Sequence, residues 1–245
     1  MHELTRVIAV QTAYLKAHFP PEYMTAMLTA ERDDSEKLAL YVADARRMGI
    51  EVLPPDINHS DLDFQVQDRG NGSNAVRFGL CAIKNVGEGA VEEVLRARSE
   101  HGPFANADDF SVQVDLRKVG KRALESLVKV GAMDSMAPRH QLLLAIEQLL
   151  GASAAVHKAA EVGQATMFDM LSEQSGSANI DLQPDAEEIP ARLLRSWEKE
   201  LVGVYVSEHP LLSHMAEIEQ AITAYSGDLT EMEGKVVTLA GTIAH

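Results

Sequence analysis

The sequence predicts a mainly α-helical protein, and three observations lead to that class. Of its 245 residues, 46% are hydrophobic, 24% are charged and only 5% are aromatic, which is typical of a soluble, helix-rich globular protein. Apolar residues recur at helical spacing over two long stretches, 7–48 and 80–146, and the second stretch is interrupted at His101-Gly102-Pro103 and at Gly131. Strand-like alternation is confined to short runs near residues 64–66, 76–78 and 235–240. We therefore expect helices to dominate the fold, with a small β-hairpin and one late strand.

Three helices are predicted in the first stretch. Pro20 and Pro21 separate the first helix from the second, because proline lacks a backbone donor and favours the start of a helix. The polar run 31–35 caps the third helix, and Gly49 ends it. Two further prolines, 54 and 55, predict an extended, looped path after this helix.

A short β-hairpin and a second helical region follow. The runs 64–66 and 76–78 flank the turn sequence DRGNGSN, which favours a hairpin. After residue 150 the composition shifts to Ala, Ser, Gly and acids, as in a linker, before a helix anchored by Trp197. The expected divisions are a helical segment 1–60, a β-hairpin 61–80, a helical domain 81–150, a linker 151–190, a helical segment 191–233 and a strand 234–245.

A glycine-rich turn is the most informative feature of the helical domain. Ile83 and Val86 precede Gly87 as h-x-x-h-Gly, and Leu127 and Val130 precede Gly131 in the same register. Glycine permits positive φ in a tight turn and lets phosphate oxygens approach the N–H groups of the next helix. The pattern predicts a duplicated helix-hairpin-helix that straddles a nucleic-acid duplex. The alternative is that these glycines only terminate helices.

Local charge defines which residues would touch DNA. The formal net charge of −15 argues against electrostatic binding of nucleic acid by the surface as a whole, so binding must rely on a local basic cluster. The second turn lacks a second glycine, which weakens its predicted phosphate contact. The predicted DNA-binding residues are Lys84, Gly87, Glu88, Gly89, Lys121, Arg122, Lys129 and Gly131.

A short apolar motif interrupts the polar linker. Gln164 is followed three and four residues later by Met167 and Phe168. Burying two such side chains in a partner's pocket would contribute about 1.5–3 kcal/mol each. The pattern therefore favours a docking peptide, and the alternative is that both side chains fold back onto the chain's own core.

The sequence gives little support for a metal site, a phosphate-binding P-loop or nucleophilic catalysis. Asp61 and Asp63 could share one strand face and hold Mg²⁺, but no further carboxylate converges there, so we interpret them as solvated loop residues. His209 and His214 lack metal-ligand spacing, and no phosphate-binding P-loop or nucleophilic triad is present. The single cysteine, Cys81, and the absence of an apolar span or signal pattern predict a cytoplasmic protein without a membrane partner.

Five segments along the chain are distinctive in sequence, order and spacing. They are QTAYLKAHFPPEYMTAMLTAE (11–31), MGIEVLPPDIN (48–58), RFGLCAIKNVGEGAVEEV (77–94), KRALESLVKVGAMD (121–134) and LVGVYVSEHPL (201–211). Together they resemble the C-family of bacterial replicative DNA polymerases, the alpha subunits of DNA polymerase III, and the resemblance covers nearly the whole chain.

The resemblance implies a role for each part. Residues 1–60 would be the end of the fingers domain, about 75–150 the tandem helix-hairpin-helix, and the closing strand the start of an OB-fold. Gln164, Met167 and Phe168 match the family's sliding-clamp-binding peptide. The palm domain with its catalytic aspartates and Mg²⁺, and the PHP domain, would lie outside this stretch. We therefore expect no catalytic residue or cofactor here, and no polymerase activity from these residues alone.

Three hypotheses follow. The first is a replicative polymerase segment whose partners are double-stranded DNA, the sliding clamp and other replicase subunits. The second is a segment of an error-prone C-family polymerase used in damage tolerance, against which the clamp peptide argues. The third is a helical protein-interaction module whose hairpins do not bind DNA.

Overall fold

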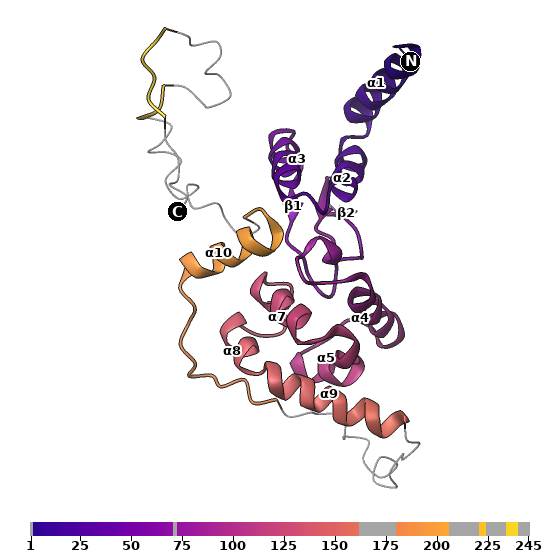
Figure 1. Ribbon diagram of the computed structural model, residues 1–245, viewed down its shortest axis with the longest axis vertical. Coiled ribbons are helices and arrows are strands. Elements are labelled where there is room, and N and C mark those ends of the chain that lie inside the picture. Colours follow the sequence, from indigo (N-terminus) through magenta and orange to yellow (C-terminus); the bar gives the residue numbers. More distant parts are fainter. Residues whose placement is uncertain (1, 71–72, 162–179, 206–220, 224–233, 240–245) are drawn as a thin grey trace. The chain divides into compact units, whose positions relative to one another are not determined.

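The computed structural model describes residues 2–70, 73–161, 180–205, 221–223 and 234–239. The chain divides into two compact units, Met1–Val206 and Ser207–His245. Every helix and strand named below lies in the first unit (Figure 1). The predicted mainly helical class is confirmed.

The three predicted N-terminal helices are present as α1 (His2–His18), α2 (Pro20–Ala30) and α3 (Ser35–Arg47). The two prolines occupy the first two positions of α2, where the missing N–H groups would have no intrahelical partner. At α3 the Asp34 side chain accepts hydrogen bonds from two backbone N–H groups of the first turn. Gly49 follows α3 with φ of +77°. The buried apolar residues of these helices include Met24, Leu28, Leu38 and Val42.

The predicted β-hairpin belongs to a three-stranded sheet. Strands β2 (Gln65–Asp68) and β3 (Asn74–Arg77) pair antiparallel, as expected. Strand β1 (Val52–Leu53) pairs parallel with β3 and forms the other edge, where the sequence had predicted only a looped path. Two residues carry no periodicity, so this strand is defined only by its hydrogen bonds to β3.

The second helical region contains one short 3₁₀ turn and six helices packed around a common core. Helix α4 ends as predicted at Gly102, which has φ of +92°. The elements are η1 (Leu80–Ala82), α4 (Glu88–His101), α5 (Ala107–Gln113), α6 (Leu116–Val119), α7 (Lys121–Lys129), α8 (Arg139–Leu144) and α9 (Ile146–Glu161). The largest fully buried side chains here include Phe110, Leu116, Leu124, Leu127 and Met133.

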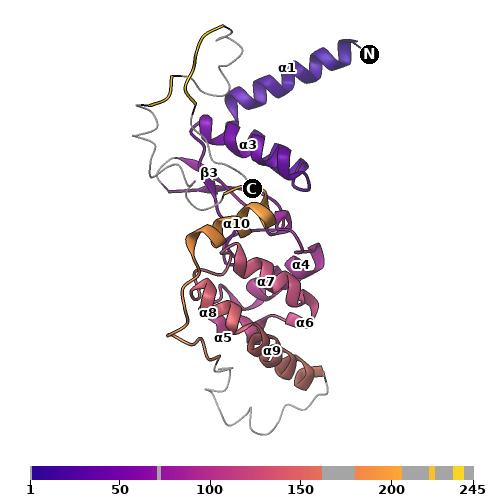
Figure 2. The same cartoon turned by 60° about the vertical axis from the view of Figure 1, so that its left-hand side comes forward.

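The predicted helix around Trp197 is α10 (Ala191–Val202). It lies beside α7 in two views (Figure 1 and Figure 2). Before α10, the segment that starts at Ile180 runs along the helical region, where the Ile180 N–H donates to the Asp108 carboxylate at 2.6 Å. The α10 helix therefore packs back onto the hairpin region although about 60 residues separate it from α7 in sequence.

The predicted strand at 235–240 is wrong for the part of it that the structure describes. Residues 235–239 have no strand assignment. The Thr223 N–H donates to the Thr238 carbonyl at 3.1 Å, and the Thr238 N–H donates to the Thr223 hydroxyl. A strand needs a continuous ladder with a neighbour, and two bonds at one threonine do not make one.

Candidate nucleic-acid interface

The first predicted hairpin turn differs from the expected geometry. The element directly before Gly87 is the 3₁₀ turn η1 and not an α-helix, so the predicted helix before this glycine is wrong. Gly87 has φ of −84° and caps the start of α4. The positive φ of the turn, 71°, falls on Asn85, a residue type that tolerates the left-handed region. The apolar pair Ile83 and Val86 is buried, as the motif requires.

The second predicted turn is also misplaced, because Gly131 terminates α7. Its N–H donates to the Val128 carbonyl and the Ala132 N–H donates to the Leu127 carbonyl, which together form a Schellman motif. Gly131 has φ of +81°, and a Cβ placed there would clash with the Arg139 guanidinium. Gly131 therefore terminates a helix, which is the alternative that the sequence left open. It does not begin a helix as Gly87 does, so the geometry gives no support to its predicted phosphate contact.

The structural counterpart of Gly87 is Gly120, 33 residues later. Leu116 and Val119 precede Gly120 as h-x-x-h-Gly, and Gly120 caps the start of α7 as Gly87 caps α4. Aligned on these glycines, KNVGEGAVEEV and RKVGKRALESL share the Val-Gly pair, the alanine three residues later and the glutamate five residues later. Reading past the glycine into the following helix would have revealed this register.

The contacts between the two hairpins are reciprocal. The Asn85 amide in the first turn donates to the Ser126 hydroxyl of α7 at 3.2 Å. The Lys118 ammonium in the second turn donates to the Glu93 carboxylate of α4 at 2.9 Å. Asn85 corresponds to Lys118 and Glu93 to Ser126 in the 33-residue repeat. Each turn thus contacts the equivalent point of the other hairpin's helix, which is the contact pattern of an approximate two-fold axis.

Glu93 is the electrostatic centre of this contact. Its side chain is only 4% exposed, and it accepts from Arg96, Lys118 and the Asp115 N–H. Burial by itself raises the pKa of this carboxyl, but the hydrogen bonds from Arg96 and Lys118 outweigh it and lower the pKa to about 2. Glu93 is therefore ionised at neutral pH and fixes α4 to the second turn.

Both hairpins present a helix start that no side chain caps. Neither Gly87 at α4 nor Gly120 at α7 is associated with a capping hydrogen bond. The residues that open the two helices, Glu88, Gly89, Lys121 and Arg122, are exposed. Free N–H groups and the positive end of the helix dipole favour an anion at such a position.

The predicted DNA-contacting cations differ in how far they are already paired. Lys121 contacts Glu147 at 2.5 Å, and Lys129 lies 5.6 Å from the centre of the Trp197 ring. Lys84 and Arg122 are exposed and form no ion pair among the residues that the structure describes. These two are therefore the cations most available to a phosphate.

An acidic residue stands in the first turn of α4. The Glu88 carboxylate is 61% exposed and lies 3.3 Å from the Arg32 guanidinium, which also pairs with Asp63. Arg32 partly compensates the negative charge of Glu88 at this helix start. The predicted role of Glu88 in DNA binding therefore concerns its backbone N–H, because its carboxylate repels phosphate.

The remaining predicted sites give no further chemistry. Gln164, Met167 and Phe168 lie outside the described residues. Among the residues that are described, no group of three His, Cys, Asp or Glu side chains could hold a metal ion, and no helix is long and apolar enough to cross a membrane. Burial raises the pKa of Cys81 to about 11, so its thiol stays protonated.

Comparison with known proteins agrees with this geometry. A family model for the helix-hairpin-helix motif matches residues 49–142, a range that contains both hairpin turns. The DNA polymerase III subunit alpha of Thermus aquaticus is 41% identical over 241 residues, which are 97% of this chain. The subunit of the same name from Escherichia coli K12 is 36% identical over 97% of the chain, and that from Vibrio cholerae is 36% identical over 86%.

The chain belongs to the DNA polymerase III alpha-subunit family. Its alignment runs through the hairpins and α10 alike, so the family relationship is not limited to the motif. The chain spans about a fifth of the length of these relatives, since it covers 19% of the Thermus aquaticus protein and 20% of the Escherichia coli protein. The family membership predicted from the sequence segments is thus confirmed.

Proposed function

We propose that this part of the alpha subunit binds double-stranded DNA through its backbone, without sequence preference, during DNA replication. The observation that carries the proposal is the pair of equivalent hairpins with reciprocal contacts between Asn85 and Ser126 and between Glu93 and Lys118. The two strands of a duplex are themselves related by two-fold axes. A pair of equivalent phosphate-binding turns therefore suits one duplex, with one turn on each strand.

The chemistry of each turn supports the same partner. The exposed, uncapped start of α4 or α7 offers N–H donors, and Lys84 or Arg122 adds an unpaired positive charge beside it. Such contacts read the sugar-phosphate backbone and carry no sequence information. A net charge of −15 disfavours DNA binding over a wide surface, so the contact must rely on local groups of cations such as those beside these turns.

We also propose that Gln164, Met167 and Phe168 bind the sliding clamp. The support is the sequence pattern of this peptide and its family resemblance. A clamp-bound peptide would hold the hairpins near the duplex at a high effective concentration, so that a released duplex is rebound before it diffuses away. We propose other replicase subunits as further partners, on the family resemblance alone. The clamp peptide is the one observation that argues against the alternative of an error-prone C-family polymerase.

DNA binding is tested by fluorescence anisotropy with labelled duplexes of unrelated sequence over a range of salt concentrations. We expect similar affinities for all sequences and a steep loss of affinity with salt. In the Lys84→Ala/Arg122→Ala variant the slope of log K against log salt falls by about 1.8, since each lost phosphate contact removes about 0.9. Chelation of Mg²⁺ should leave binding unchanged.

A matched control uses Arg6→Ala/Lys158→Ala, which removes the same charge from exposed positions on α1 and α9. An equal change in both double variants would mean that only net charge matters. Absence of duplex binding by the unmodified chain would favour the protein-interaction module. For the clamp, capture of the chain and of its Met167→Ala/Phe168→Ala variant on immobilised clamp is compared, and equal retention of both would refute the tether.

A further inference from the structure

Helix α10 lies outside the segment matched by the hairpin motif, yet it contacts both hairpins. The Lys84 N–H in the first turn donates to the Leu201 carbonyl at 2.8 Å. On the second hairpin, Trp197 lies under the Lys129 ammonium of α7. Next to it, Glu198 lies 3.3 Å from the guanidinium of Arg139, the first residue of α8. These contacts fix α10 beside α7 (Figure 2). Any surface of α10 that faces solvent is therefore held at a constant position relative to the hairpins.

One side of α10 carries three cations. Arg192, Arg195 and Lys199 are spaced by three and four residues, which places them along one side of the helix. Arg192 and Lys199 are exposed and Arg195 is half-exposed. The buried side of α10 is formed by Glu198, Leu201 and Val202.

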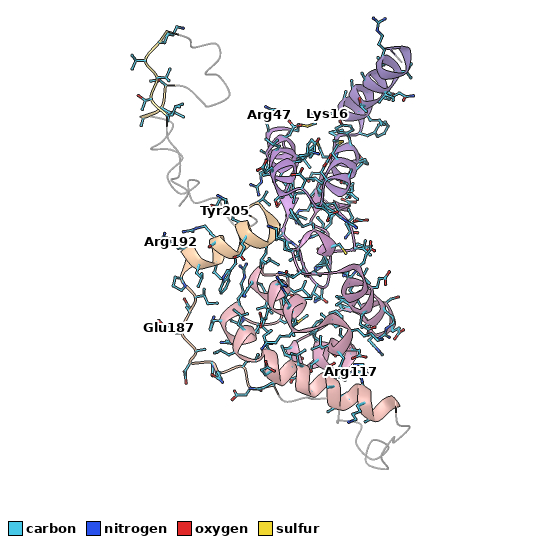
Figure 3. All side chains as sticks on the ribbon, viewed as in Figure 1. Lys16, Arg47, Arg117, Glu187, Arg192 and Tyr205 are labelled. Atoms are coloured by element: carbon cyan, nitrogen blue, oxygen red, sulfur yellow. The ribbon has the colours of Figure 1, made fainter. Side chains whose placement is uncertain are left out.

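These three cations differ from most others in the same unit. Lys16, Arg32, Arg47, Arg96, Arg117, Lys118, Lys121 and Arg139 each form an ion pair with an Asp or Glu. No ion pair among the described residues involves Arg192, Arg195 or Lys199. Glu198 of the same helix pairs with Arg139, and Glu187 lies apart from Arg192 along the preceding segment (Figure 3).

Helix stability does not explain the arrangement. Arg192 stands in the first turn of α10, where a positive charge opposes the helix dipole and no acidic residue compensates it. Lys199 in the last turn is favourable for the helix, but Arg195 in the middle is neutral in this respect. The stability of α10 therefore gives no reason for a cation at Arg192 or Arg195.

We propose that Arg192, Arg195 and Lys199 form a third phosphate-contacting element that binds the backbone of the same DNA duplex as the hairpins. From Arg192 to Lys199 the helix advances by about 10 Å. The phosphates of one strand rise by ~3.4 Å per nucleotide along the axis and also wind around it, so a helix face of this length can meet more than one neighbouring phosphate. The three cations are therefore placed to neutralise adjacent phosphates of one backbone. This inference rests on the proposed duplex binding by the hairpins.

The test compares two double variants of equal charge and composition. Arg192→Gln/Lys199→Gln removes one arginine and one lysine from the proposed contact, and Arg6→Gln/Lys158→Gln removes the same pair from exposed positions elsewhere. We expect the α10 variant to bind a labelled duplex about tenfold more weakly in moderate salt, with a salt slope smaller by about 1.8. The control should change the slope by less than about 0.5. Adding Arg195→Gln should reduce the slope further.

Each outcome is decisive. A slope change equal to that of the control overturns the inference, while continued sensitivity of binding to Lys84→Ala/Arg122→Ala leaves the hairpin function intact. Loss of clamp capture by the α10 variant without loss of duplex binding would also overturn it, in favour of a protein-binding surface. If the unmodified chain fails to bind any duplex, the proposed function itself fails. Unfolding midpoints of all variants, measured by circular dichroism, should coincide, because the substituted side chains are at the surface.

Discussion

The turns at Gly87 and Gly120 share one repeated sequence pattern, but a different position of the turn adopts positive φ in each. In the first turn, Gly87 has an ordinary φ of −84° and Asn85 adopts the left-handed conformation at 71°. In the second turn, Gly120 itself adopts φ of +80°. The charge differs too, since α4 opens with Glu88 and α7 with Lys121 and Arg122. A shared motif therefore determines where the turn lies, while the neighbouring residues determine which residue has positive φ and what charge stands at the helix start.

The comparison of the turns at Gly87 and Gly120 holds only if Gly131 does not belong to the repeat. Gly131→Ala tests this, and it is the substitution expected to lower the free energy of unfolding most. Alanine at φ of +81° costs about 1–2 kcal/mol, and its Cβ would displace the Arg139 guanidinium from the buried Glu198. We expect the free energy of unfolding in urea to fall by about 3 kcal/mol or more. The folded fraction should keep its affinity for duplex DNA, and a selective loss of that affinity would return Gly131 to the turn motif.

Glu93→Gln tests whether the two hairpins depend on each other. It removes a buried carboxylate that joins α4 to Lys118, and we expect a loss of about 2 kcal/mol at pH 7, since Arg96 and Lys118 remain partly solvated. The folded-state pKa of Glu93, about 2, lies below its ordinary value of 4.5. Its contribution is therefore complete above about pH 5 and disappears as the pH falls towards 2.

The measurement is urea unfolding at several pH values. The unmodified protein should lose stability between pH 5 and 2 more steeply than Glu93→Gln, and the two curves should converge at the acidic end. Parallel curves would show that Glu93 is not the group responsible. Glu92→Gln, at the neighbouring position of the same helix, serves as the control.

Alanine at each turn glycine compares the two backbone conformations directly. Gly120→Ala introduces a Cβ at positive φ and should cost about 1–2 kcal/mol. Gly87→Ala meets no atom within 4 Å at an ordinary φ, so its stability should change by less than about 0.5 kcal/mol. Thermal unfolding of both variants gives the answer. Equal losses would mean that the difference in φ has no energetic consequence.

The smallest effect concerns the charge difference between the turns. Glu88→Gln removes a carboxylate from the start of α4, and we expect duplex affinity to rise about twofold at moderate salt because phosphate repulsion decreases. The stability of α4 should fall by about 0.3–1 kcal/mol, since an acid at a helix start is favourable. Anisotropy titrations measure the affinity, and Glu100→Gln at the far end of α4 is the control.

Local patterns predicted much of this unit. The three N-terminal helices, the β-hairpin, the end of α4 at Gly102 and the helix around Trp197 follow from prolines, caps and periodicity, which act over a few residues. The two errors in placing the hairpin turns have a common origin. The pattern h-x-x-h-Gly occurs before Gly87, Gly120 and Gly131, and only the helix that follows distinguishes a hairpin turn from a helix end.

The sequence by itself determined the family, the helical class and the presence of glycine turns with nearby cations, because these depend on residue identity and short spacing. Only the tertiary structure decided which turns are equivalent, which cations are paired and where α10 lies. Those properties depend on contacts between distant residues, such as Glu93 with Lys118, Lys121 with Glu147 and the Lys84 backbone with Leu201. Such contacts form only when the packed core brings the residues together.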